Sequence, residues 1–154
     1  MEKALRKQPA HGVIELPDRA TVVELTICAE NRMPWIASPV VQAIMQNVWQ
    51  QAQGWLVGYY MLMPEHLHLL AALGDIDCSL ERWVTYWKRE VTRAHKQTEW
   101  RLQSDHWDTR IRNGKHFTEV WDYIRQNPVR RGLVSDPDDW PFQGVIHDWR
   151  WSGP

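Results

Sequence analysis

Residues 55–72 have the sequence WLVGYYMLMPEHLHLLAA, and this stretch decides the fold. Residues 55–63 form a run of apolar and aromatic side chains, which predicts a buried strand. Met63-Pro64-Glu65 ends that run, because proline has no N–H to give to a strand ladder. Residues 66–72 then predict the antiparallel neighbour of the first strand.

Three helices are predicted around these strands. Ser38 is a suitable N-cap, and Pro39 follows it at the first helical position. Ser79 caps a second helix in the same way. The third helix must stop near Asn127, because Pro128 disfavours helical geometry in the residue before it. The apolar stripes of the three helices are Val41, Ile44, Met45 and Val48; Leu80, Trp83, Val84, Trp87, Val91 and Ala94; and Phe117, Val120, Trp121 and Ile124.

Alternating side chains predict two more strands, over residues 21–28 and 106–112. In the first of them Val23, Leu25 and Ile27 share one face. The order strand, helix, strand, strand, helix, strand and final helix is a split βαβ arrangement. It predicts an α+β fold, in which an antiparallel sheet carries helices mainly on one face.

Length and composition indicate one globular domain. The chain has 154 residues, of which 44% are hydrophobic. No apolar run approaches the ~18 residues that a membrane span needs, and no secretory signal is visible, so we expect a cytoplasmic protein with no membrane partner. Cys28 and Cys78 form no metal or redox motif. We expect a domain over residues 20–134, an N-terminal arm over residues 1–19 and an irregular tail over residues 135–154 packed on the domain.

Charge is unevenly distributed along the chain, although the formal net charge is -1. Residues 82–131 hold 12 Lys and Arg but only six Asp and Glu. On the second helix Arg82, Arg89, Arg93 and Lys96 form a strip that contains no acid, and this strip is either a phosphate-binding surface or a solvated helix face. The predicted nucleic-acid contacts are Arg82, Lys88, Arg89, Arg93, Lys96, the pair Arg110 and Arg112 on one strand face, Arg130 and Arg131.

His66-Leu67-His68 is the first candidate for chemistry. Residues two apart on a strand point to the same face, so both imidazoles project together while Leu67 faces the opposite core. Two imidazoles placed in this way can share one divalent ion. A pair of hydrogen-bonded histidines on a half-exposed sheet is the alternative, and the pattern alone leaves it open.

Tyr123 and Asn127 are the second candidate. They are four residues apart on the third predicted helix, hence one above the other, and His116 shares their strip. The strip lies at the edge of the apolar stripe. Tyr123 either offers its hydroxyl to a neighbouring surface or is an ordinary amphipathic tyrosine at a core boundary.

Three motifs in a fixed order resemble a known family. They are MPEHLHLL at 63–70, WDTRIR at 107–112 and YIRQNPVRRGLV at 123–134. Their combination is similar to the REP-associated tyrosine transposases, which belong to the single-tyrosine HUH transposase superfamily. The resemblance implies a ferredoxin-like sheet with the His-x-His pair on a central strand and a tyrosine-bearing helix near the C-terminus.

The resemblance also implies an activity. Family members cleave and rejoin single-stranded DNA at hairpin-forming repetitive extragenic palindromes. His66 and His68 match the metal-binding pair, Tyr123 matches the nucleophile, and Asn127 matches the polar residue that completes the metal site. The implied cofactor is a divalent cation, Mg or Mn, and the implied intermediate is a 5′-phosphotyrosine. The expected partner is single-stranded hairpin DNA, bound by a monomer or a homodimer.

Glu65 departs from the family pattern, since many relatives have asparagine before the first histidine. Its carboxylate lies either beside the site or on the opposite face of the sheet. Other interpretations are a hairpin DNA or RNA binding module that does not cut, an RNA-binding domain with sheet aromatics, and a replication initiator or relaxase. Tyr59 and Tyr60 cannot both face one side of a strand, which weakens the RNA-binding interpretation. The short chain weakens the interpretation as a replication initiator or relaxase.

Overall fold

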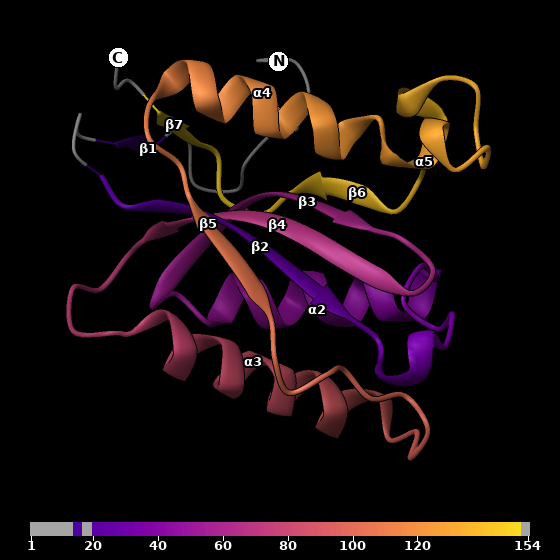
Figure 1. Cartoon of the computed structure of the whole chain (residues 1–154). Helices are drawn as coiled ribbons and strands as arrows, with labels where there is room; N and C mark the ends of the chain where they lie inside the picture. The colour runs from indigo at the N-terminus through magenta and orange to yellow at the C-terminus, as the bar shows by residue number, and fades with distance from the viewer. Residues whose placement is uncertain (1–13, 17–19, 152–154) are drawn as a thin grey trace.

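The computed structural model describes residues 14–16 and 20–151. The main strands are β2 (Val22–Cys28), β3 (Trp55–Leu62), β4 (His66–Leu73), β5 (Trp107–Arg110) and β6 (Gln143–Val145). They form an antiparallel sheet in the order β5-β2-β4-β3-β6, with β4 in the middle (Figure 1). The predicted α+β fold is therefore present, and the strand that carries both histidines is central.

Helices cover both faces of this sheet. Helices α2 (Pro39–Gln51) and α3 (Leu80–His95) lie on one face, and α4 (Gly114–Arg125) lies on the other (Figure 1). The expectation of helices mainly on one face holds for α2 and α3, whereas the last long helix, α4, lies on the other face. The reason is the apolar stripe of α4, because Phe117 and Trp121 are buried against the second face of the sheet.

Strand β4 supplies side chains to two separate hydrophobic cores. Leu67 and Leu69 belong to the core beneath α2 and α3, whereas Leu70 and Ala72 belong to the core beneath α4. This alternation places the even-numbered residues of β4, including both histidines, on the α4 face. A strand buried on both faces reads as a nearly continuous apolar run, as residues 69–73 do.

The predicted helix starts are confirmed at Ser38 and Ser79. The Ser38 hydroxyl accepts from the Val41 N–H at 3.2 Å, and the Ser79 hydroxyl accepts from the Arg82 N–H at 3.2 Å. Asn113 caps α4 in the same manner. Side-chain caps of this kind satisfy N–H groups that have no partner inside the helix.

The chain turns at the end of α4 and forms one more helical turn, α5 (Asn127–Arg130). Pro128 lies in the first turn of α5, where a missing N–H needs no intrahelical partner. The prediction that α4 stops near Asn127 is confirmed. Asn127 itself becomes the first residue of α5 and is buried.

The expectation of an irregular tail is wrong for part of residues 135–154. Strand β6 extends the central sheet by pairing with β3, and β7 (Trp149–Trp151) pairs in parallel with β1 (Ile14–Leu16). Strands of three residues are too short for alternation to reveal them in a sequence. A Cβ at Gly58 would lie 2.8 Å from the Trp149 indole, so this glycine allows the tail to pack on β3.

The remaining short elements are the 3-10 helices η1 (Glu30–Arg32) and η2 (Pro137–Asp139). Of the predicted N-terminal arm, residues 1–13 and 17–19 lie outside the described residues. Cys28 and Cys78 are free thiols, as the sequence predicts. Within the described ranges, no helix has the length and apolar character to cross a membrane.

Candidate catalytic site

His66 and His68 project from the middle strand toward α4. In the register of β2 and β4, Cys28 lies opposite His66 and Thr26 lies opposite His68. The centroids of the two imidazole rings are 4.9 Å apart, with the rings edge to face. The structure thus places both rings on one face, as their spacing predicts.

Each imidazole is held at its Nδ1 atom by a carboxylate or hydroxyl. His66 Nδ1 lies 2.9 Å from Glu65 Oε1. His68 Nδ1 lies 2.9 Å from Thr26 Oγ1 and 3.2 Å from Glu24 Oε2. The Thr26 hydroxyl donates to Glu24 at 2.7 Å, so its oxygen accepts from His68. These contacts assign the proton to Nδ1 in both rings and leave the Nε2 lone pairs unprotonated.

Asn127 lies within hydrogen-bond distance of both Nε2 atoms. Its Nδ2 atom lies 3.2 Å from His66 Nε2 and 3.2 Å from His68 Nε2. Asn127 reaches them from the start of α5, across the α4 face of the sheet. The structure therefore brings together three of the residues that the sequence predicts for the site.

The three side chains fit a divalent cation. Two Nε2 lone pairs converge, and rotating the amide of Asn127 by 180° would present its oxygen in place of its nitrogen. No cluster of three or more His, Cys, Asp or Glu side chains with metal-binding geometry occurs in residues 14–16 and 20–151. A cation here would thus have two imidazoles and one amide as protein ligands, and phosphate or water oxygens would fill the other positions.

The protonation states of the site favour metal binding. Burial, reinforced by the neighbouring His68, lowers the pKa of His66 to about 4 despite the opposing effect of Glu65. His66 is therefore neutral at pH 7. The hydrogen bond from Arg131 is the main cause that lowers the pKa of Glu65 to about 2, so this carboxylate is ionised. A neutral imidazole beside an anionic carboxylate is the usual arrangement behind a metal ligand.

Glu65 lies beside the site and not on the opposite face of the sheet. Arg131 donates to both of its oxygens, Nη1 to Oε1 and Nη2 to Oε2, with the second contact at 3.2 Å. Glu65 comes before the first residue of β4, so strand alternation does not set its direction. Arg131 is a predicted DNA contact, and in the structure it is bonded to this carboxylate.

Arg131→Ala should lower the free energy of unfolding by about 1 kcal/mol, because Glu65 is buried and Arg131 is only half exposed. It should also weaken Mn²⁺ binding about 10-fold, since Glu65 would no longer be fixed behind His66. Chemical denaturation and calorimetric Mn²⁺ titration measure the two effects. Arg101→Ala is the control, and the Arg131→Ala effects should shrink in a Glu65→Gln background. Equal effects in both backgrounds would contradict the coupling.

Tyr123 lies on the last turn of α4 and is 64% exposed. The guanidinium of Arg130 lies 3.9 Å from the centroid of its ring, and Arg130 Nη1 donates to the Tyr123 carbonyl oxygen at 2.8 Å. Within the described part of the chain, no hydrogen bond joins Tyr123 to the imidazoles or to Asn127. The structure therefore places the predicted nucleophile about one helical turn before Asn127, held by Arg130 and open to a ligand.

The predicted basic strip on α3 lies on the opposite side of the sheet from the imidazoles (Figure 1). Lys88 donates to the Gln103 carbonyl at 2.6 Å, and burial lowers its pKa. The strip itself contains no acid, as predicted, but Arg93 forms an ion pair with the neighbouring Glu90 at 3.2 Å. The reason is the helical spacing of three residues, which lets Glu90 reach the strip from its border.

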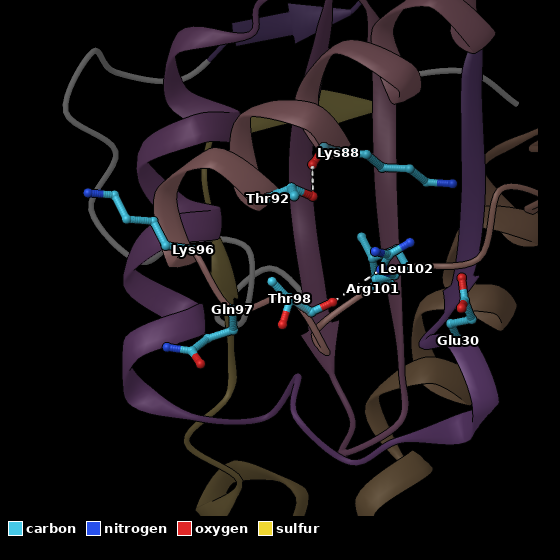
Figure 2. Close-up of a pocket in the computed structure, with 8 residues that line it drawn as sticks. All are labelled: Glu30, Lys88, Thr92, Lys96, Gln97, Thr98, Arg101 and Leu102. Carbon is cyan, nitrogen blue, oxygen red and sulfur yellow. Dashed lines mark hydrogen bonds between the residues drawn. The ribbon is translucent and has the colours of Figure 1, made fainter.

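Lys88 and Lys96 also line an open groove of about 570 Å³ at the C-terminal end of α3 (Figure 2). Arg101 and Glu30 line it too, so its charges are mixed. Of the other predicted contacts, Arg110 is the last residue of β5. Arg112 lies beyond that strand, and its backbone N–H donates to His116 Nδ1 at 3.0 Å. The prediction that both arginines share one strand face is therefore wrong, because β5 ends before Arg112.

Sequence reasoning missed the groups that hold the imidazoles. Glu24 and Thr26 are the polar residues on the face of β2 opposite Val23, Leu25 and Ile27. Two polar side chains at alternate positions of a buried strand were the available signal. Nothing in the sequence indicates that Arg131 returns to Glu65.

The sheet offers no aromatic platform on β3. Tyr59 and Tyr60 are buried in different cores, one on each face of the sheet. The Tyr59 hydroxyl donates to Gln143 Oε1 at 2.6 Å, and the Tyr60 hydroxyl accepts from Gln42 and Gln46. The RNA-binding interpretation therefore loses Tyr59 and Tyr60 as exposed aromatics for base stacking.

Comparison with known proteins identifies relatives over part of their length. No family model matches the chain. A REP-associated tyrosine transposase of Escherichia coli (strain K12) is 35% identical over 94 residues, which are 60% of this chain and 55% of that protein. A Haemophilus influenzae protein with the same family name is 30% identical over 100 residues, 56% of this chain and 57% of that protein. The chain thus spans about half the length of these curated relatives.

A solved structure supports the same relationship at the level of fold. It is a REP-associated tyrosine transposase bound to a REP hairpin, with a TM-score of 0.69 and 23% sequence identity, and the match covers 80% of this chain and 75% of that one. The resemblance that the three motifs predict is confirmed. In sequence and in fold, the chain is a relative of the REP-associated tyrosine transposases.

Proposed function

We propose that the chain is a metal-dependent endonuclease and strand transferase for single-stranded DNA, which cleaves hairpin-forming repetitive extragenic palindromes through a 5′-phosphotyrosine. The observation that carries the proposal is the convergence of two imidazole Nε2 atoms on Asn127, about one helical turn after an exposed tyrosine. The relatives named transposases and the structural neighbour bound to a REP hairpin support the substrate class.

Tyr123 is the proposed nucleophile. Its phenol oxygen attacks the phosphorus and loses its proton to solvent, the new O–P bond forms, and the bond from phosphorus to the 3′-oxygen breaks. The departing 3′-oxygen takes up a proton from solvent and becomes a 3′-hydroxyl, while the 5′ end of the other DNA fragment stays attached to Tyr123 through its phosphate. Because the phosphodiester becomes a phosphotyrosine ester, its energy is kept for rejoining.

His66, His68 and Asn127 would hold the divalent cation. The cation would polarise the scissile phosphate and stabilise the charge that develops on its oxygens. Glu65, Glu24 and Thr26 orient the imidazoles through Nδ1, so that both lone pairs point to one place. Arg130 keeps the phenol ring at the end of α4.

Exposed Arg and Lys side chains would bind the DNA backbone. Variants on α3 test whether the DNA-binding surface extends to that helix. Arg89→Glu with Arg93→Glu should weaken hairpin affinity about 10-fold at low salt and make its dependence on salt less steep, because two phosphate contacts are lost. At saturating DNA the rate of cleavage should stay unchanged, since α3 covers the other face of the sheet. Fluorescence anisotropy over a range of salt concentrations measures both properties of binding.

Lys115→Glu, which reverses a charge at the far end of α4, is the control for that pair. An unchanged salt dependence in the double variant would show that the strip is a solvated helix face. A lower cleavage rate at saturation would contradict the separation of the two faces.

The experiment that tests the function uses a synthetic hairpin with a single-stranded flank, labelled at its 3′ end. With Mn²⁺ we expect a labelled protein band that survives denaturation in SDS. A hairpin that is bound without any such band would identify a binding module that does not cut.

A further inference from the structure

Trp107 differs from the other tryptophans of the chain. It is 65% exposed, and every other tryptophan is buried or half-buried. It begins β5, an edge strand whose four residues are all exposed. An exposed indole is costly in water, so a ligand that covers it would gain hydrophobic and stacking energy.

The register of the sheet places Trp107 in the same row as the imidazoles. Trp107 pairs with Thr26 on β2, and Thr26 pairs with His68 on β4. Paired residues of antiparallel strands point to the same face, so the indole and the His68 ring share the α4 face. Strands lie about 4.8 Å apart, which puts Trp107 and His68 roughly 10 Å apart along the sheet.

The residue between Trp107 and His68 in this register is polar. Thr26 lies between the two residues and contacts His68 Nδ1 with its hydroxyl. A DNA strand whose phosphate lies at the imidazoles would pass over Thr26 toward β5. The base attached next to that phosphate would then meet the indole.

The surroundings of Trp107 favour a flat ligand over a protein partner. The residues that follow it on β5 are Asp108, Thr109 and Arg110, which are polar and exposed. The indole is therefore an isolated apolar surface and not part of the broad patch that a protein interface needs. One ring can bury one nucleobase. Arg110 pairs with Val23 and therefore points to the other face of the sheet, so the indole is the feature of β5 that a base on the α4 face would meet.

We propose that Trp107 stacks on a base of the single-stranded flank, beside the phosphate that Tyr123 attacks. The proposal rests on the proposed function for the position of the DNA. It assigns to β5 a base-binding position that would set where the strand lies relative to the imidazoles.

The test measures binding in a Tyr123→Phe background, so that the DNA stays intact. The probes are the labelled hairpin with a single-stranded flank and a set in which each flank base in turn is replaced by an abasic site. Trp107→Ala should weaken binding of the intact probe about 5- to 100-fold, and Trp107→Phe should recover part of the loss. The probe that lacks the stacked base should bind the Tyr123→Phe protein more weakly than the intact probe does. Adding Trp107→Ala should then lower its affinity little further.

Ile76→Ala removes another exposed apolar side chain, in the loop before α3, and should leave binding unchanged. Affinity within twofold of the parent for Trp107→Ala would overturn stacking, as would an unchanged pattern across the abasic probes. A loss of self-association in place of a loss of affinity would show that β5 pairs with a second copy, and would also overturn it.

The two proposals fail in different ways. If the chain with Tyr123 intact forms no covalent adduct while binding still depends on Trp107, the cleavage function is wrong and stacking stands. If the adduct forms and Trp107→Ala changes neither affinity nor the abasic pattern, stacking is wrong and the function stands.

Discussion

Tyr123→Phe is expected to abolish covalent attachment of the chain to hairpin DNA, a loss of at least about 10³-fold, because the variant lacks the attacking oxygen. The side chain is 64% exposed, so the fold and its stability should hardly change. Hairpin affinity should stay within about twofold of the parent. Denaturing gels quantify the adduct, and anisotropy quantifies the binding.

Tyr86→Phe is the matched control for this variant. Tyr86 lies on α3 and is 44% exposed, whereas Tyr59 and Tyr60 are buried. Tyr86→Phe should form the adduct at the parent rate. An adduct that persists in Tyr123→Phe and disappears in Tyr86→Phe would move the nucleophile to the other side of the molecule and refute the proposed site.

His66→Ala and His68→Ala should each reduce adduct formation by about 10²- to 10³-fold, since a catalytic metal would lose one of its two imidazole ligands. The same variants should lose the heat of Mn²⁺ binding in a calorimetric titration without DNA. EDTA should stop cleavage by the parent protein, and added Mn²⁺ should restore it. The titration measures the site independently of the reaction.

His116→Gln is the control for the two imidazoles. His116 lies at the start of α4, where it accepts from the Arg112 N–H, and it contacts neither imidazole nor Asn127 through a hydrogen bond in the described residues. It should keep both Mn²⁺ binding and cleavage. Undiminished cleavage in EDTA would contradict metal dependence, and Mn²⁺ binding that survives both alanine variants would place the cation elsewhere.

The parts of the fold that could be predicted are those set by local rules. The spacing of His66 and His68 fixes their shared face, because a strand alternates with period two. Ser38 and Ser79 begin helices because their hydroxyls satisfy backbone N–H groups within the next few residues. Each of these features depends on residues close together in the sequence.

The parts that were missed depend on packing between distant segments. The direction of α4 across the second face follows from which core accepts Phe117 and Trp121. The ion pair of Glu65 and Arg131 joins residues that are far apart in the chain, at positions where no local pattern applies. Strands β6 and β7 are held by backbone pairing and tertiary packing, so their side chains carry no strand signal.

The candidate site shows the same division. Strand period and the family resemblance predicted His66, His68, Tyr123 and Asn127, and the structure brings three of these into contact. The basic residues of α3 were predicted from their helix face alone, and a helix face does not tell on which side of the sheet the helix packs. For that reason α3 carries basic residues that lie away from the imidazoles.

Peptide mapping of the trapped protein–DNA complex tests the central claim most directly. Trypsin cuts after Lys115 and Arg125, so Tyr123 is the only tyrosine in the peptide of residues 116–125. After digestion with trypsin and nuclease, mass spectrometry should find this peptide carrying a nucleotide through its 5′-phosphate. A nucleotide on the peptide that contains Tyr86, or cleaved DNA with a free 5′-phosphate and an unmodified protein, would contradict it.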